Sequence, residues 1–317
     1  MNYLYKPEGM LEKTPENKEA LSSPAALQAA MRAGKILEAP VLLCDSNMRL
    51  HVDLGCMRGI IEREEAVYCR PGEVVKDIAV ITRVGKTVAF KILRFAKEDG
   101  ETVAMLSRRA AQDACIAEYL SELLPGDIIP VRVTHLENYG AFVDIGCGIS
   151  SLLSIDCISV SRISHPRDRL ACGMYLWVAV KSIDREMKRI FVTLKELLGT
   201  WEENAAGFAQ GETVVGRVRS IESYGIFVEL TPNLAGLAEL RSSNNVPIHT
   251  AVGDLAAVFI KSILPERMKI KLVIIDSYAA DVRPEVPKYY IDVAHTHHMD
   301  YWEYSPACST RLIETIF

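Results

Sequence analysis

The chain has 317 residues, of which 49% are hydrophobic and 24% are charged, and its formal net charge is −5. These values are typical of a globular protein with room for two to four small domains. No run of about 18 apolar residues occurs, and the polar, acidic N-terminus argues against a secretory signal, so we expect neither a membrane span nor export. The eight cysteines lack a Cys-x-x-Cys spacing, which favours reduced thiols in a cytoplasmic protein.

The N-terminal residues 1–22 are polar and show no apolar period, which predicts a disordered tail. Ser23 and Pro24 form a plausible N-cap and first-turn pair, so a short helix is expected to open a β-rich first unit over residues 23–106. The rest of the chain divides into helix-spaced connectors over 107–124 and 195–210, β-rich units over 125–194 and 211–277, and a C-terminal extension over 278–317.

A segment in the middle of the chain returns 85 residues later without a gap, because residues 126–145 align with residues 211–230. The identical residues are Gly126, Arg132, Val133, Glu137, Tyr139, Gly140, Phe142 and Val143, which recur as Gly211, Arg217, Val218, Glu222, Tyr224, Gly225, Phe227 and Val228. Repetition at a fixed period identifies the unit from which a fold is built. Here that unit is a small β domain with a Tyr-Gly-x-Phe-Val hairpin.

Alternation within the repeat separates the two faces of a strand. Successive strand side chains point to opposite faces, so Val143 is predicted to face the core while Phe142 and Asp144 face outward. The third unit repeats the pattern, with Phe227 and Glu229 outward. The sequence therefore predicts a phenylalanine beside a carboxylate on the outer face of two units.

Aromatic rings on the outer face of a β domain are typical of barrels that bind nucleic acid. Five-stranded OB barrels bind single strands on such a face, and base stacking is tolerant of sequence. Arg132 and Arg217 also point outward and are candidates for phosphate contacts. Two pairs of rings fit the stacking role: Tyr139 with Phe142, and Tyr224 with Phe227. The alternative is that these rings cap the barrels or pack against a neighbouring unit.

The pattern Val-Arg-Val to Asp-Ile-Gly over residues 131–146, with residues 165–173 and 178–193, resembles the repeat of bacterial ribosomal protein S1. Residues 216–230, 234–237 and 252–253 extend the resemblance to the third unit, and the first unit matches weakly. The resemblance implies a mainly β fold of three tandem five-stranded OB-type barrels joined by short helical connectors.

In that family an aromatic pair, a histidine, an aspartate and an arginine on one face contact single-stranded RNA. For the second unit, the resemblance implies a site made of Tyr139, Phe142, Asp184, Lys188 and Arg189. Ser154 stands at the histidine position, which leaves that contact in doubt.

The third unit departs further from the family pattern. It keeps Tyr224 and Phe227, but Lys269 replaces the arginine. Glu239 occupies the histidine position and Leu264 the aspartate position. We therefore expect the third unit to bind RNA more weakly than the second.

The first unit keeps the frame of the repeat without its aromatic pair. Residues 52–55 register with residues 143–146, which places His51 at the phenylalanine and Met48 at the tyrosine. A basic strand remains, with Arg83, Lys86, Lys91 and Arg94. Docking on the ribosome or on another protein and contact with RNA stay open as equal alternatives for this unit.

The C-terminal extension combines histidines with aromatic residues. His295, His297, His298 and Cys308 suggest a metal, but their spacing does not fit a zinc site, so no metal is expected. The extension is predicted to attach to the third unit, or to form a partner surface, through Tyr289, Tyr290, Tyr301, Trp302 and Tyr304. No catalytic motif is found, so we expect no enzyme activity, cofactor or small-molecule substrate.

The resemblance implies a cytoplasmic protein that contacts single-stranded mRNA and acts in translation, with the small ribosomal subunit as its expected partner. A protein-interaction adaptor and a free post-transcriptional RNA regulator are the alternatives. The net charge of −5 counts against simple nucleic-acid binding, which usually needs a basic footprint. A near-neutral module can nevertheless bind single strands when its cations line one face and stacking supplies the rest.

Overall fold

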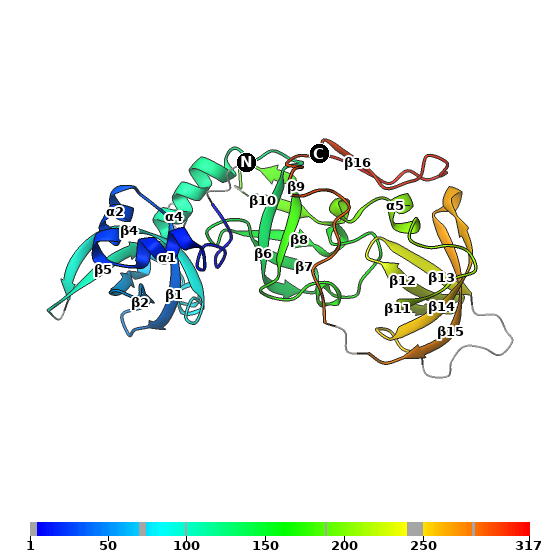
Figure 1. The fold of residues 1–317 in the computed structure, drawn as a ribbon, viewed down its shortest axis with the longest axis horizontal. Helices are drawn as coiled ribbons and strands as arrows, with labels where there is room; N and C mark the ends of the chain where they lie inside the picture. The colour runs from blue at the N-terminus through cyan, green and yellow to red at the C-terminus, as the bar shows by residue number, and fades with distance from the viewer. Residues whose placement is uncertain (1–4, 70–73, 99, 188, 240–249, 281–282) are drawn as a thin grey trace. The chain divides into compact units, whose positions relative to one another are not determined.

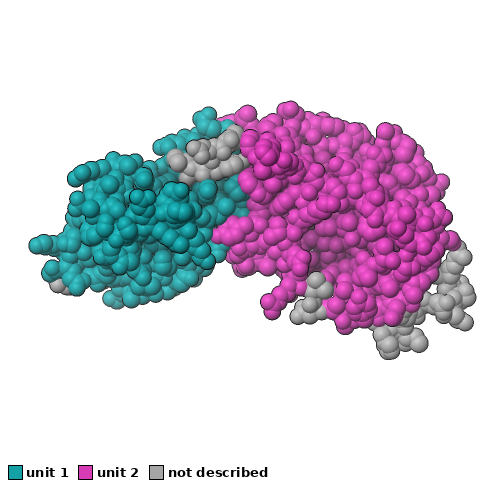
Figure 2. All heavy atoms as spheres, viewed as in Figure 1, with its two compact units in different colours: residues 1–123, 130–132, 144–150 teal, residues 124–129, 133–143, 151–317 magenta. Residues whose placement is uncertain are grey.

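The computed structural model describes residues 5–69, 74–98, 100–187, 189–239, 250–280 and 283–317. Within these residues, most of the regular structure is strand, arranged as three closed five-stranded barrels in chain order (Figure 1). The predicted mainly β fold of OB-type barrels is thus confirmed. The chain forms two compact units, one of residues 1–123, 130–132 and 144–150 and the other of residues 124–129, 133–143 and 151–317 (Figure 2).

All three barrels share one topology, in which the strands are hydrogen-bonded in the order first, second, third, fifth, fourth. The third and fifth strands are parallel in each barrel, whereas the other pairings of the first and third barrels are antiparallel. The first barrel contains β1 (Leu37–Cys44), β2 (Leu50–Asp53), β3 (Arg58–Ile61), β4 (Thr87–Glu98) and β5 (Glu101–Ser107). The second contains β6 (Ile128–Glu137), β7 (Gly140–Asp144), β8 (Ser150–Ser154), β9 (Tyr175–Asp184) and β10 (Arg189–Thr193). The third contains β11 (Thr213–Glu222), β12 (Gly225–Thr231), β13 (Leu234–Glu239), β14 (Leu255–Leu264) and β15 (Lys269–Tyr278).

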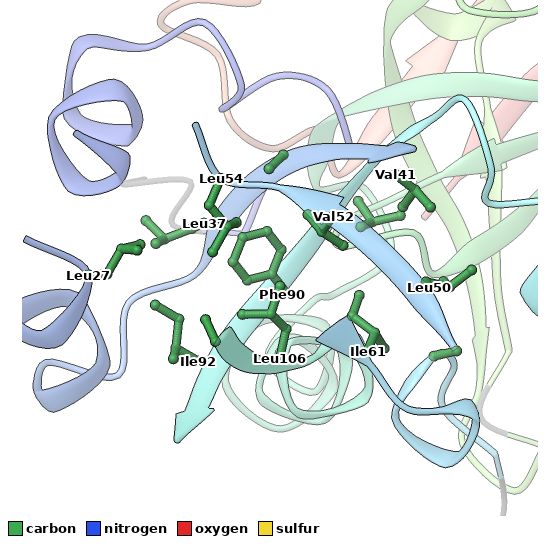
Figure 3. Close-up of a cluster of buried hydrophobic side chains, with 14 of the residues drawn as sticks. Leu27, Leu37, Val41, Leu50, Val52, Leu54, Ile61, Phe90, Ile92 and Leu106 are labelled. Carbon is green, nitrogen blue, oxygen red and sulfur yellow. The ribbon is translucent and has the colours of Figure 1, made fainter. Parts of the chain in front are cut away.

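The core of the first barrel is built around Phe90, which is fully buried among aliphatic side chains from several strands (Figure 3). The predicted helix is α2 (Pro24–Arg32), where the Oγ of Ser23 accepts a hydrogen bond from the N–H of Ala26 at 3.2 Å. This helix buries Leu27 in the same core. The remaining helices of this barrel region are α1 (Pro15–Leu21), α3 (Asp77–Ile81) and a single 3-10 turn at Arg63–Glu65.

The expected disordered tail over residues 1–22 is wrong for residues 5–22, which are folded against the first barrel. One oxygen of the Glu38 carboxylate, Oε2, accepts hydrogen bonds from the backbone N–H groups of Gly9, Leu11 and Glu12 at 3.0, 2.9 and 2.9 Å. The Asn17 side chain pairs with both backbone groups of Glu38, at 2.8 and 2.9 Å. The segment is held by buried hydrogen bonds, which an apolar period does not reveal.

A buried ion pair joins the N-terminal segment to the first connector. The Arg108 side chain is 2% exposed, and its Nε donates to Oε1 of Glu8 at 2.6 Å. The backbone N–H of Glu8 in turn donates to Oδ2 of Asp144 at 2.7 Å. Arg108 begins α4 (Arg108–Cys115), which continues as a π-helical turn over Ile116–Leu120, so the first connector is helical as predicted.

The second connector and the C-terminal extension pack against the second and third barrels. The connector contains a 3-10 turn (Lys195–Leu198) and α5 (Trp201–Ala205). In the extension, β16 (Tyr301–Glu303) pairs with β17 (Glu314–Ile316), and Trp302 and Tyr304 lie in the core of the third barrel. The hydroxyl of Tyr289 accepts the backbone N–H of Trp177 in the second barrel at 2.9 Å. The aromatic residues therefore attach the extension to the third barrel, as predicted, and also to the second.

Glu38 generates a prediction about pH. Burial raises the pKa of Glu38 to about 8 from an ordinary value of 4.5, although three backbone N–H groups favour its charged form. The folded state then holds a proton that the unfolded state releases, so this contribution to stability is complete below the unfolded pKa and is lost as pH rises through about 8. Between pH 4.5 and about 8, we expect the free energy of unfolding to fall by up to about 1.4 kcal/mol per pH unit.

The neutral variant Glu38→Gln should reduce this slope, measured by urea unfolding followed by circular dichroism at a series of pH values. Burial also raises the pKa of Asp144, to about 7, so some slope should remain in the variant. An identical slope in the variant and the natural protein would contradict the assignment to Glu38.

Candidate nucleic-acid interface

The predicted ring pairs are exposed and have the same geometry in two barrels. Tyr139 lies in the two-residue turn between β6 and β7 and is 55% exposed, and Phe142 on β7 is partly exposed. Their ring centroids are 6.2 Å apart with an interplanar angle of 89°. Tyr224 and Phe227 repeat this with 6.2 Å and 89°, and Tyr224 is 60% exposed. An edge-to-face contact is a favourable arrangement that fixes each pair without covering it.

The glycine between the two rings is required by the closeness of the next strand. A Cβ atom on Gly140 would lie 2.5 Å from the carbonyl oxygen of Leu153, and one on Gly225 would lie 2.8 Å from that of Ala238. Because backbone atoms cannot move aside cheaply, only glycine fits these positions. The glycine of the repeated Tyr-Gly-x-Phe pattern therefore has a packing cause, and the binding role of the rings stays a prediction.

A third ring lies beside the pair in the second barrel, and the sequence analysis missed it. The imidazole of His135 on β6 stacks on Phe142, with centroids 6.4 Å apart and an interplanar angle of 27°. Its Nε2 lies 2.7 Å from Oε1 of Glu137. Strand alternation could have predicted its position, because His135 and Glu137 are two residues apart and therefore share a face of the strand.

Two of the predicted polar residues of the second barrel, Asp184 and Arg189, lie at the end of the β9–β10 hairpin where the turn begins. Arg189 is exposed and stands directly opposite Asp184 in the strand pairing. The Oδ1 atom of Asp184 accepts the backbone N–H of Met187 at 2.8 Å, so this carboxylate also stabilises the turn. Lys188 lies outside the described residues. Contact of these groups with RNA stays a prediction.

A further partly exposed ring, missed from the sequence, is Phe191 on β10. It pairs with Leu152 on β8, the strand that neighbours β7. In the third barrel, the residues paired across neighbouring strands form the corresponding row, in which Phe227 on β12 is followed by Leu237 on β13 and Lys271 on β15. Lys271 therefore shares a row with the ring, whereas the predicted Lys269 stands two residues earlier, at the start of β15. Lys271 is also paired with Glu239, Nζ to Oε1 at 3.7 Å, so its charge is partly compensated.

The predicted arginines are not beside the ring pairs. Arg132 donates through Nη1 to the backbone oxygen of Glu8 at 3.4 Å. Arg217 is opposite Glu229 in the β11–β12 pairing, whereas Ser220 is opposite Phe227. Burial and the neighbouring charge of Arg219 lower the pKa of Arg217. Phosphate contact by either arginine remains untested.

The two carboxylates predicted to lie exposed beside the rings are buried instead. Asp144 is 3% exposed and accepts the N–H groups of Gly146 and Gly148 in addition to that of Glu8. Glu229 is 7% exposed because other side chains cover that part of the barrel.

Glu229 is paired with two arginines. Arg169, from the loop between β8 and β9 of the second barrel, binds both of its carboxylate oxygens. Arg219 donates through Nε to Oε2 at 2.6 Å. Although burial favours the neutral acid, these two partners lower the pKa of Glu229. The charged carboxylate therefore joins the third barrel to the second.

The first barrel has a polar network where the other barrels have rings. His51 and Arg49 both lie 3.0 Å from Oδ2 of Asp45, and Arg49 also pairs with Glu98 at 3.0 Å. Burial favours the neutral acid, but hydrogen bonds from His51 and Arg49 hold the pKa of Asp45 well below its ordinary value. These charges are paired with one another, and Met48 and His51 stand where the other two barrels have tyrosine and phenylalanine.

The C-terminal histidines are distributed among separate partners. His298 lies 2.7 Å from Asp127 and 3.3 Å from Asp300, and the Asp127 contact raises its pKa. His295 pairs with Asp292. Over the described part of the chain, no group of three or more His, Cys, Asp or Glu side chains is placed to hold a metal ion. Likewise, no helix in the described ranges is both long and apolar enough to cross a membrane.

Comparison with known proteins identifies a domain and relatives. Residues 122–195 match the family model described as the S1 RNA binding domain. The chain is 31% identical over 258 residues to small ribosomal subunit protein bS1 of Neisseria meningitidis, covering 78% of this chain and 44% of that protein. It is 31% identical over 173 residues to bS1 of Staphylococcus haemolyticus, covering 53% and 43%. The chain thus spans less than half the length of these relatives.

A solved structure from Streptococcus pneumoniae, described as a multidomain protein with nucleic acid binding domains, covers 76% of this chain and 73% of its own. The identity is 16% and the TM-score is 0.24.

The buried ion pairs of Glu229 with Arg169 and Arg219 lead to a prediction about stability. Glu229→Ala leaves Arg169 and Arg219 buried without their partner, which should cost about 3–5 kcal/mol. Urea unfolding followed by tryptophan fluorescence is the measurement, because Trp201 and Trp302 lie in the core of the third barrel. The matched control is Glu222→Ala, an exposed carboxylate on β11, which should change stability by less than about 0.5 kcal/mol. Equal effects of the two substitutions would contradict the structural role of Glu229.

Proposed function

We propose that the chain, which is similar to bacterial ribosomal protein S1 and contains an S1 RNA binding domain match, binds single-stranded RNA through the exposed rings of its barrels. The observation that carries the proposal is the ring pair of Tyr139 and Phe142. The pair is partly open to solvent, fixed edge to face, and located inside the segment that matches the S1 RNA binding domain. Bases stack on such rings with little dependence on sequence.

The second barrel is the main platform in this proposal. It has the ring pair, a further ring at Phe191 and the exposed cation of Arg189. The third barrel repeats the ring pair, but Lys271 in the same row is paired with Glu239, and that carboxylate repels phosphate. The first barrel has no ring pair, and its charges at the same place are paired internally. RNA affinity therefore decreases from the second barrel to the third and then to the first.

The second and third barrels together gain from being linked. The third barrel and most of the second belong to one compact unit, and within that unit the ion pair of Arg169 with Glu229 connects them. A strand held on one platform is kept at high effective concentration near the other, so two modest sites bind one RNA more tightly than either alone. This supports the capture of an extended, unstructured segment such as single-stranded mRNA.

The role we propose is in translation, with the small ribosomal subunit as partner. The support is the name of the relatives, which are proteins of that subunit. The chain covers 43–44% of the length of those relatives, so the proposal extends to binding the small subunit and not to every activity of the longer proteins. Binding of the purified chain to isolated small subunits, measured by cosedimentation, tests this part separately from RNA affinity.

The central test compares the two ring pairs. Tyr139→Ala with Phe142→Ala should raise the Kd for an unstructured RNA oligomer by about tenfold or more, because stacking contributes about 1–3 kcal/mol per base. The matching double variant at Tyr224 and Phe227 should have a smaller effect. Fluorescence anisotropy with a labelled oligomer at fixed salt is the measurement.

Negligible losses in both double variants would remove the aromatic platforms from the proposal. Titrations at several salt concentrations separate RNA binding from the adaptor alternative. Contacts with phosphates make log affinity fall linearly with log salt.

The Lys271–Glu239 pair leads to a gain-of-function prediction. Glu239→Ser introduces the residue found at the matching position of the second barrel, Ser154. Removing the carboxylate frees Lys271, so RNA should bind the third barrel up to about fivefold more tightly, the range for an exposed ion pair.

The effect should be read in a Tyr139→Ala, Phe142→Ala background, where the third barrel dominates binding. Glu212→Ser removes an equal charge outside that row and is the control. Equal gains from the two substitutions would indicate net charge rather than the Lys271 pair.

A further inference from the structure

We propose that His135 is a base-stacking residue of the second barrel, and that with Tyr139 and Phe142 it forms a three-ring surface that the third barrel lacks. This inference rests on the proposed RNA-binding function and deepens it. His135 is not one of the positions that the resemblance to the S1 family assigns to RNA contact. Its presence in the second barrel accounts for the proposed difference in RNA affinity between two repeats that share the same ring pair.

The first support is the orientation of the imidazole. It lies nearly parallel to Phe142, with an interplanar angle of 27° and centroids 6.4 Å apart, whereas Tyr139 meets Phe142 at 89°. The His135 side chain is 63% exposed although one face is directed at Phe142. The opposite face is therefore open to solvent and available to a base.

The second support is the contact that holds the ring. Nε2 of His135 lies 2.7 Å from Oε1 of Glu137, which is on the same face of β6. The carboxylate fixes the edge of the imidazole and leaves its faces unobstructed. It also offsets any positive charge on the ring, so the geometry favours stacking on a base over attraction of a phosphate.

The third support comes from the repeat itself. At the position that matches His135, the third barrel has Ser220, which stands opposite Phe227 in the strand pairing. Glu222 and Tyr224 match Glu137 and Tyr139. The third barrel thus has the carboxylate and both rings but not the imidazole.

The competing interpretation is that His135 and Glu137 form a surface ion pair without a ligand. Both side chains are well exposed, 63% and 44%, and such pairs commonly contribute little to stability. The two interpretations differ in what a change of residue does to RNA binding, because a surface ion pair touches no base.

The experiment uses the full chain, a labelled unstructured RNA oligomer and fluorescence anisotropy. In the natural background, His135→Ser should raise the Kd by about tenfold, the loss of roughly one stacked base. His135→Phe keeps an aromatic face and should stay within about twofold of the natural protein. Circular dichroism should be unchanged in both, because the side chain is exposed.

The reciprocal variant tests sufficiency. In a Tyr139→Ala, Phe142→Ala background, Ser220→His places an imidazole between Glu222 and Phe227 and should lower the Kd several-fold, up to about tenfold. Ser220→Ala in the same background is the control and should leave the Kd unchanged.

The outcomes separate this inference from the proposed function. If His135→Ser binds as the natural protein does while Tyr139→Ala with Phe142→Ala binds weakly, His135 is a surface ion pair and the inference fails alone. If His135→Phe loses as much affinity for the RNA as His135→Ser, the proposal that His135 stacks on a base is contradicted. If the double variant also binds normally, the proposed function fails with it.

Discussion

A buried carboxylate at one position of the repeat is the interaction on which this structure depends. Asp144 and Glu229 occupy matching places at the end of the second strand of their barrels, 85 residues apart. Asp144 accepts the N–H of Glu8, whose own carboxylate pairs with the buried Arg108. Glu229 binds Arg169 of the preceding barrel and Arg219 of its own. A carboxylate taken out of water is costly unless it is paired, so these contacts tie each residue firmly to segments outside its own strand.

In the second and third barrels, the outer face of the second strand consequently has two structural roles. The end of the second strand attaches to other segments through its carboxylate, and the start carries the Tyr-Gly-x-Phe rings. Because Gly140 and Gly225 lie against a neighbouring carbonyl group, the backbone there cannot accept a side chain, and the rings are held in one geometry. Differences between barrels then come from a few side chains around a constant frame: His135 against Ser220, Phe191 against Lys271, and Ser154 against Glu239.

Several features were predictable because they follow from local pattern. The core positions Val143 and Val228 follow from strand alternation, the helix at Pro24 from its N-cap, and the ring pairs from the repeat. The sequence predictions for other features were wrong for one shared reason. The tail at residues 5–22, Asp144 and Glu229 all looked solvent-exposed because they are polar. Each is held by hydrogen bonds to partners between 10 and 136 residues away, and no local period encodes such partners.

The sequence by itself determined the order of the three β-rich units and the place of the ring pairs, because strand alternation is a local pattern and the 85-residue repeat is visible in the residue order. That each unit is an OB-type barrel was what the resemblance implied. Tertiary structure alone decided which outward residues reach solvent and which become joints. It turned Glu229 from a surface charge into a link between barrels and placed His135 on Phe142. It also placed Lys271 in the same cross-strand row as Phe227, with Leu237 between them. These outcomes depend on strand register and barrel contacts, which bring together residues that are distant in the chain.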